Sequence, residues 1–129
     1  MAETETRLRR LIADDVGECC DDDVSRRLDE LDELADETFA DDGASTVFAV
    51  LGNETRYRLT RLLSAADDEL CVCELEPLVD VSESAVSHAL SDLADAGLVD
   101  RRKDGNWRYY TSTRLAEDLF ATADGEVDA

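Results

Sequence analysis

Two stretches within residues 1–42 carry apolar residues at intervals of three or four, the spacing that gathers side chains on one face of a helix. The two stripes are Leu8, Leu11 and Ile12, then Val24, Leu28, Leu31 and Ala35. The polar segment 16–23 separates them, and Asp23 is a candidate N-cap for the second helix. We therefore expect a helical N-terminal extension that ends near residues 40–43 and packs on itself or on a partner subunit.

The next segment is more apolar and predicts several short helices. The run 46–51 indicates a short buried helix ending at Gly52, after which Asn53 is suited to cap a helix that carries Leu59, Leu62 and Leu63. A further helix is expected over about 72–79. Its first turn should lie close to Pro77, because proline lacks an amide hydrogen and is tolerated only where a helix begins.

The clearest helix follows Ser82, a good N-cap, and Val81 can pack on Val86 beside it. Its apolar positions, which should face the core, are Val86, Ala89, Leu90 and Leu93. Strand-like segments 98–102 and 107–111 then flank an Asp-Gly turn signal within 103–106. A last helix carries Leu115, Leu119 and Phe120.

The order of these elements predicts a mainly α-helical fold with a small β-hairpin, a winged helix-turn-helix. We expect an acidic helical extension over 1–42, the winged helix-turn-helix over 43–122 and a flexible acidic tail over 123–129. The helix after Ser82 occupies the position of the DNA-reading helix, and the hairpin occupies the position of the wing.

Charge narrows the possible partners. Asp and Glu total 33 against 13 Lys and Arg, a net charge of -20, and Lys103 is the only lysine. Nonspecific attraction to nucleic acid through bulk positive charge is therefore excluded. The acids are spread along the chain, which favours adaptation to molar salt, as in extreme halophiles, over a dedicated acidic interaction surface.

The sequence has no apolar run near the ~20 residues of a membrane span. Its N-terminus is acidic and lacks the apolar stretch of a secretory signal, so we expect a cytoplasmic protein without membrane contact. An enzyme is not expected, because the chain has one histidine, no phosphate-binding glycine loop and no evident pair of nucleophile and base.

Two adjacent features point to DNA. The outer face of the predicted reading helix is free of acids, although the chain is rich in them, and the hairpin 101–108 has a local charge of +3. Small polar side chains let a helix enter the major groove, and a basic wing can contact phosphates. An ordinary solvated helix beside a charged hairpin is the alternative. The candidate DNA-binding residues are Ser82, Ser84, Ala85, Ser87, His88, Ser91, Arg101, Arg102, Lys103, Asn106 and Arg108.

Four cysteines form two close pairs, Cys19 with Cys20 and Cys71 with Cys73. A reducing cytosol argues against structural disulfides and favours metal binding or redox chemistry. Cys71 and Cys73 suit a soft ion, but residues i and i+2 do not face each other on a regular helix. Binding one ion would therefore need a distortion where the helix begins, and Cys19 or Cys20 could complete the site within one chain or across a dimer.

Four segments together resemble the ArsR/SmtB family of metal-sensing repressors. They are Glu-Leu-Cys-Val-Cys-Glu-Leu at 69–75, Ser-Glu-Ser-Ala-Val-Ser-His-Ala-Leu at 82–90, Ala-Gly-Leu-Val at 96–99 and Arg-Arg-Lys-Asp-Gly at 101–105. The resemblance implies a homodimer, held by its terminal helices, that binds palindromic double-stranded operator DNA and leaves it when an ion binds. Cys71 and Cys73 match the family's thiolates. The zinc site on the family's C-terminal helix is not expected, because no histidine lies there.

We therefore predict a repressor that releases DNA on binding arsenite or antimonite through three sulfurs, with cadmium, lead or zinc as alternative ions and no organic cofactor. Two other classes stay open. The thiols could form a redox switch, which peroxide rather than metal ions would operate. Alternatively, the chain could buffer metal while its winged helix contacts only proteins, in which case it would have no specific DNA affinity.

Overall fold

The computed structural model describes residues 2–16, 21–40 and 43–125, which fall into two compact units, one within 1–42 and one within 43–129. The first unit holds helices α1 (Ala2–Val16) and α2 (Asp21–Phe39), which contact each other. An ion pair of 2.7 Å joins Arg9 to Asp21. The prediction that Asp23 caps the second helix is wrong, because α2 already begins at Asp21 and Asp23 lies inside its first turn.

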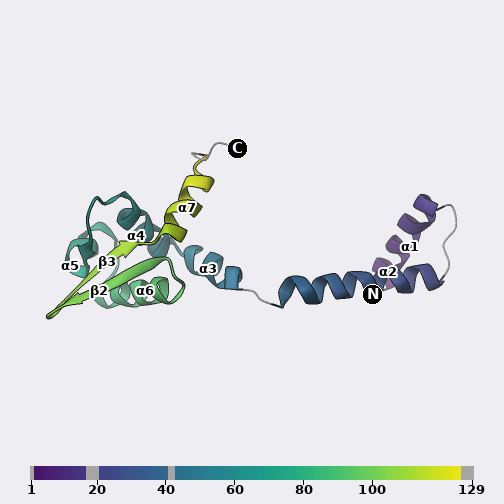
Figure 1. Ribbon diagram of the computed structural model, residues 1–129, viewed down its shortest axis with the longest axis horizontal. Coiled ribbons are helices and arrows are strands. Elements are labelled where there is room, and N and C mark those ends of the chain that lie inside the picture. The colour runs from purple at the N-terminus through teal and green to yellow at the C-terminus, as the bar shows by residue number, and fades with distance from the viewer. Residues whose placement is uncertain (1, 17–20, 41–42, 126–129) are drawn as a thin grey trace. The chain divides into compact units, whose positions relative to one another are not determined.

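The second unit contains a bundle of helices and a small antiparallel sheet. Figure 1 shows the long hairpin of β2 and β3 extending away from the helices. The elements in chain order are α3 (Gly43–Leu51), α4 (Glu54–Ala65), β1 (Leu70–Cys71), α5 (Val72–Leu75), the 3-10 helix η1 (Glu76–Leu78), α6 (Glu83–Asp95), β2 (Val99–Asp104), β3 (Trp107–Ser112) and α7 (Arg114–Ala123). The sheet order is β1-β3-β2, so β3 is the central strand.

The core of this unit forms where α4 and α6 pack against each other and against the sheet. Its most buried side chains are Leu59, Leu75, Leu90, Leu93 and Leu98, all at 0% exposure. The apolar stripe predicted for α6 is confirmed, since all four of its residues are buried. This packing fixes α6 beneath the wing and leaves its opposite face to solvent.

Side-chain caps set the starts of three helices. Asn53 accepts a hydrogen bond of 3.1 Å from the amide of Arg56, and Ser82 accepts one of the same length from the amide of Ala85. Both caps were predicted from the sequence. Thr113 caps α7 in the same way, and its hydroxyl also donates to the carbonyl oxygen of Gly97 at 2.7 Å. That bond ties the end of the wing to the end of α6.

Three predicted details differ from the structure. The helix over 46–51 begins earlier, at Gly43, and none of its residues is buried, with Phe48 at 62% exposure. The helix expected over 72–79 is only four residues of α5 followed by η1, because Pro77 lies in η1 rather than in a first α-helical turn. The strands also continue to Asp104 and Trp107, so the hairpin turn is tighter than the four residues expected.

Candidate thiol site and nucleic-acid interface

Cys71 lies where a strand becomes a helix. It ends β1, where it pairs with Tyr109 of β3, and it is also the N-cap residue of α5. Its backbone is extended, with φ -92° and ψ 168°, and its amide donates a hydrogen bond of 3.0 Å to the Glu74 carboxylate. The carboxylate of Glu74 thus satisfies the backbone amide at the N-cap of α5.

Cys73 lies in the first turn of α5, and its sulfur is bonded to that of Cys71 in a disulfide across a Cα–Cα distance of 5.4 Å. The two sulfurs meet because Cys71 is extended, whereas i and i+2 side chains on a regular helix point apart. We expected such a distortion where the helix begins, and the structure has it at Cys71, the N-cap residue of α5. The expectation that no disulfide forms is contradicted for this pair.

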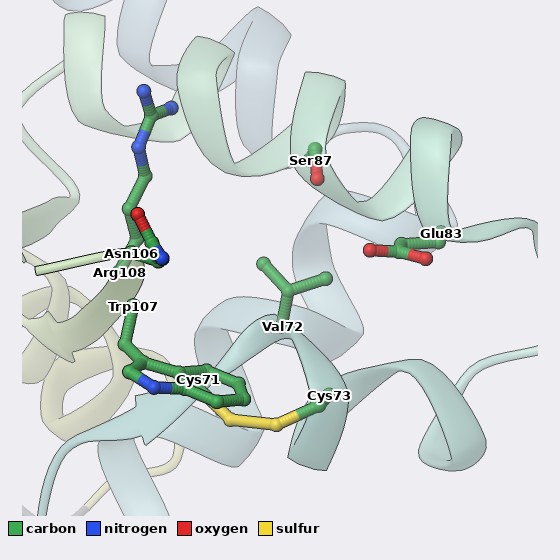
Figure 2. A pocket seen from close by; sticks show the side chains of 8 residues that line it. All are labelled: Cys71, Val72, Cys73, Glu83, Ser87, Asn106, Trp107 and Arg108. Atoms are coloured by element: carbon green, nitrogen blue, oxygen red, sulfur yellow. A yellow bond between two sulfur atoms is a disulfide. The ribbon is translucent and has the colours of Figure 1, made fainter.

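The sulfurs lie at a pocket of about 210 Å³. Its wall is built from three elements: the Cys71–Cys73 segment, the first turns of α6 and the tip of the wing. The lining residues are Cys71, Val72, Cys73, Glu83, Ser87, Asn106, Trp107 and Arg108. Figure 2 shows the indole of Trp107 lying beside the two sulfurs, while Ser87 and Glu83 belong to the facing helix. A group bound to the sulfurs would therefore also touch both elements that were predicted to read DNA.

A second connection runs from β1 to the wing. Glu69 forms a two-pronged salt bridge with Arg102 of β2, in which Nε donates at 3.0 Å and Nη2 donates to the other carboxylate oxygen. The guanidinium of Arg102 also stacks over Tyr109, at 4.8 Å from the ring centroid. The hydrogen bond from Arg102 lowers the pKa of Glu69 and raises the pKa of Arg102. The segment 69–73, which contains both cysteines, is thus linked to strand β2 of the wing by this salt bridge.

The predicted reading face of α6 is accessible. Ser84, Ala85, Ser87 and His88 are exposed, whereas Ser91 is half-buried. Ser82 is exposed too, but its hydroxyl oxygen is engaged as the cap of α6. The face therefore offers hydroxyl and imidazole groups, which can bond phosphates or base edges, and the exposed acid beside them is Glu83, one turn before Ser87.

The predicted wing residues differ in whether their side chains are free to contact DNA. Arg101, Lys103, Asn106 and Arg108 are exposed, and Asn106 follows Gly105, whose φ of 63° allows the tight turn. Arg102 was predicted to contact DNA with the others, but its guanidinium is held by Glu69. The exposed cations of the wing outside that salt bridge are accordingly Arg101, Lys103 and Arg108.

A complete three-ligand site is not formed within the described residues, which hold no group of three or more His, Cys, Asp or Glu side chains placed for a metal ion. Cys71 and Cys73 are the two possible ligands there. The predicted further ligands Cys19 and Cys20 lie outside the described residues. Soft ions prefer thiolates, so the pair suits such an ion once reduction has freed both sulfurs.

Sequence reasoning missed three parts of this arrangement. It did not assign strand β1, because two residues are too short for a periodic pattern. It did not pair Glu69 with Arg102, which lie 33 positions apart. It also gave Trp107 no role beyond the strand, although an exposed indole next to a turn is a signal that could have been noted.

Residues 53–101 match the sequence profile described as bacterial regulatory protein, arsR family. A putative arsenical resistance operon repressor of Halobacterium salinarum is 49% identical over 97% of this chain and 98% of its own. An arsenic resistance regulator of Pseudomonas putida is 44% identical over 64% of this chain and 65% of its own. The first relative supports the halophilic interpretation of the acid excess.

Solved structures agree on the fold. HlyU from Vibrio cholerae has a TM-score of 0.57 and 29% identity, covering 65% of this chain and 90% of its own. A homodimeric winged helix-turn-helix domain from Mycobacterium bovis has a TM-score of 0.60 at 24% identity, over 70% of this chain and 83% of its own.

Within the described ranges, no helix has the length and apolar composition of a membrane span. The chain belongs to the arsR family of bacterial regulatory proteins, and it is a winged-helix transcriptional regulator rather than an enzyme.

Proposed function

We propose that the chain is a homodimeric repressor that binds operator DNA through α6 and the wing and leaves it when arsenite or antimonite binds Cys71 and Cys73. The observation that carries this proposal is the shared pocket, because the two sulfurs face a space that Ser87 of α6 and Arg108 of the wing also line. An ion held by the sulfurs alters the surroundings of both DNA-contacting elements. Such coupling needs only about 1–3 kcal/mol to be useful.

The third sulfur of a pyramidal arsenite site comes from Cys19 or Cys20 in this proposal, either from the same chain or from its partner. Arsenical resistance relatives support the choice of arsenite as the first inducer. Relatives described as cadmium resistance regulators are 39% identical over 51% of this chain, which keeps cadmium as the alternative ion. Lead and zinc are further alternatives, since a thiolate site binds several soft ions with different affinities.

Exposed apolar side chains support the dimer. Phe48 of α3 and Leu115 of α7 are 62% and 42% exposed, and an open apolar pocket lined by Phe48, Leu51 and Leu119 lies between these helices and α4. Exposed apolar side chains that border an apolar pocket mark an interaction surface. The homodimeric fold neighbour supports a second copy of the chain as that partner.

The test is fluorescence anisotropy on labelled DNA from upstream of the chain's own gene, in molar KCl with reductant. We expect arsenite near stoichiometric amounts to release the DNA from the wild type and to have no effect on Cys71→Ser. A Cys19→Ser/Cys20→Ser double variant should need far more arsenite. Firm DNA binding that ignores both arsenite and cadmium would contradict the proposal.

A thiol redox switch is the second candidate, and the Cys71–Cys73 disulfide favours it. In this alternative, a peroxide oxidises the two thiols to the disulfide and is itself reduced, with the two thiol protons leaving in the water formed. The same anisotropy assay separates the candidates. Reversible release by peroxide without any response to metal ions would place the redox switch first.

A further inference from the structure

Arg56 in the first turn of α4 has a backbone that is held on both sides. Its amide donates a hydrogen bond of 3.1 Å to the side chain of Asn53, the N-cap residue of the helix. Its carbonyl oxygen accepts one of 2.7 Å from the hydroxyl of Thr60, which is fully buried. The side chain of Arg56, which is 25% exposed, therefore leaves α4 from a defined position.

The guanidinium of Arg56 reaches the C-terminal end of α3. Its Nε donates a hydrogen bond of 2.7 Å to the carbonyl oxygen of Val50, which precedes the last residue of that helix. The last four carbonyl groups of an α-helix have no partner within it. The amide of Gly52 donates to the carbonyls of Phe48 and Ala49, and Arg56 donates to that of Val50. A neighbouring helix thus completes the end of α3 and places a cation at the negative pole of its dipole.

The same guanidinium reaches α6. Its Nη1 lies 3.6 Å from Oδ2 of Asp92, whose side chain is 38% exposed. Asp92 follows His88 by four positions, so the two side chains are neighbours on the surface of the helix. Arg56 therefore contacts the end of α3 and, through Asp92, the border of the predicted reading face of α6.

We propose that Arg56 is a positioning residue for operator recognition, which holds the reading helix α6 at a fixed orientation to α3. The inference rests on the proposed function, because it concerns operator binding by a dimer. Its basis is one guanidinium that bridges Val50 of α3 and Asp92 of α6. Phe48, two residues before Val50, belongs to the apolar surface proposed to meet the second copy. The bridge therefore joins the dimer surface to the helix that reads DNA.

The hold of the core on α3 is shallow, which gives the bridge its importance. No residue of α3 is buried, and Val47, Val50 and Leu51 are only partly buried where they pack against the core. Helix α6, in contrast, is fixed to the core by four buried side chains. The polar link through Arg56 therefore adds to a limited apolar contact between α3 and the rest of the unit.

Recognition of two half-sites makes the orientation of α6 important. In a dimeric helix-turn-helix protein, the two reading helices enter the major groove at points roughly 34–36 Å apart, one helical turn of DNA. The dimer helices set where each protomer lies, and the link from α3 to α6 sets how its reading helix meets the groove. A protomer whose α6 can tilt relative to α3 still meets phosphates, but it distinguishes less well between half-site spacings.

A purely electrostatic role is the alternative, because Arg56 also neutralises an acid beside the reading face. The two roles predict different results for Asp92→Asn. If the charge alone matters, removing a carboxylate that repels phosphates strengthens binding to all duplexes alike. If Arg56 positions α6, removing the α6 end of the bridge weakens the discrimination between half-site spacings.

The experiment measures anisotropy on the operator and on the same duplex with one base pair inserted at the centre of its palindrome, using the full-length reduced protein in molar KCl. The readout is the ratio of the two affinities. We expect Arg56→Gln and Asp92→Asn each to lower this ratio by about 2- to 30-fold, the range for residues that couple two sites without contacting either ligand. Arg56→Lys should keep part of it, because an ammonium lacks the fork that serves two partners.

Arg58→Gln is the matched control, since Arg58 is an exposed arginine of the same helix whose partner, Glu54, also lies in α4. Its ratio should equal that of the wild type. Asp92→Asn leaves the bond to Val50 in place, so it tests the inference even if Arg56→Gln does not fold.

The possible results separate this inference from the proposed function. A wild-type ratio in Asp92→Asn, or an equal fall of the ratio in Arg58→Gln, would overturn the inference and leave arsenite-driven DNA release untouched. Absence of operator binding by the wild type would contradict the proposed function, and the inference with it.

Discussion

At the scale of single residues, the salt bridge between Glu69 and Arg102 joins the residue before β1 to the wing. Arg102 lowers the pKa of Glu69 below its ordinary value of 4.5. A carboxyl whose pKa is lowered by folding stabilises the folded state above its unfolded pKa, and this contribution is lost as pH falls through the folded pKa. The pair should therefore stabilise the protein at neutral pH and stop doing so in acid.

We predict that Glu69→Gln is less stable than the wild type at pH 6. The difference should shrink as the pH falls below 4.5 and be lost as it falls through the lowered pKa of Glu69. Denaturant unfolding over pH 3 to 7 in constant KCl measures it. The effect should be modest, because Arg102 is half exposed. In an Arg102→Gln background, Glu69→Gln should produce no pH-dependent difference. A difference that persists there would assign the pH effect to another group.

A second residue-scale prediction concerns the core side of α6. Leu90 is fully buried in the core cluster that includes Leu59 and Leu63 of α4, so Leu90→Ala leaves a cavity that its neighbours only partly close. Its free energy of unfolding should fall by about 2–5 kcal/mol. Leu78→Ala removes the same atoms from a 57% exposed position and should cost under about 0.5 kcal/mol. Similar losses for the two variants would contradict this description of the core.

At the scale of elements, the wing should divide into contacting and anchoring positions. Lys103 and Arg108 are exposed near the tip, whereas the guanidinium of Arg102 is engaged by Glu69. Lys103→Ala and Arg108→Ala should each reduce the slope of log affinity for operator DNA against log salt by about 1, one phosphate contact apiece. Arg58→Ala, an exposed arginine on α4 that pairs with Glu54, should leave the slope unchanged. Unchanged slopes in the wing variants would exclude phosphate contacts there.

The elements also show what could be predicted from the sequence. Apolar periodicity joined to a local start or turn signal identified α4, α6 and the hairpin. The apolar residues alone identified α7, whose Thr113 cap was not predicted. The strand β1 and the end of α5 were not identified. Their geometry depends on pairing with β3, and on Pro77 falling in a 3-10 turn, which no local pattern records. The exposure of α3 was missed for a related reason, since an apolar run does not reveal which partner covers it.

In the candidate site, too, features with a local sequence signal were predicted, and features that depend on distant residues were not. The Cys71–Cys73 pair and the exposed face of α6 were recognised because residue type and short spacing carry that information. The pocket between them, with Trp107 as its aromatic wall, depends on side chains from three separate elements. The sequence also did not show which wing arginine is engaged within the protein. Arg102 is engaged by Glu69, which lies far from it in the sequence.

At the scale of the whole molecule, the apolar surface of α3 and α7 predicts that dimerisation can be broken without unfolding the chain. Phe48→Glu places a charge on this surface and should shift the protein to a monomer in sedimentation velocity. DNA affinity should fall with it, because a monomer can bind only one half-site. Leu78→Glu introduces the same charge at a similarly exposed position outside this surface, and it should leave the dimer intact. A dimeric Phe48→Glu protein would exclude this surface as the interface.

Net charge is a second property of the whole molecule with a measurable consequence. At -20, the folded chain repels itself in dilute buffer, and mobile ions screen that repulsion over about 10 Å at 0.1 M salt and about 3 Å at 1 M. The midpoint of thermal unfolding should therefore rise between 0.1 M and 2 M KCl. A midpoint that falls over this range would argue against adaptation to molar salt.

In the proposed function the thiol site and the DNA-binding surface are coupled, and coupling between two binding sites is reciprocal. The most direct test is to measure arsenite affinity by calorimetry on the reduced protein, with and without saturating operator DNA, in molar KCl. We predict that operator DNA weakens arsenite binding by the same factor by which arsenite weakens operator binding, about 5- to 150-fold. Equal arsenite affinity for the free and the DNA-bound protein would contradict it.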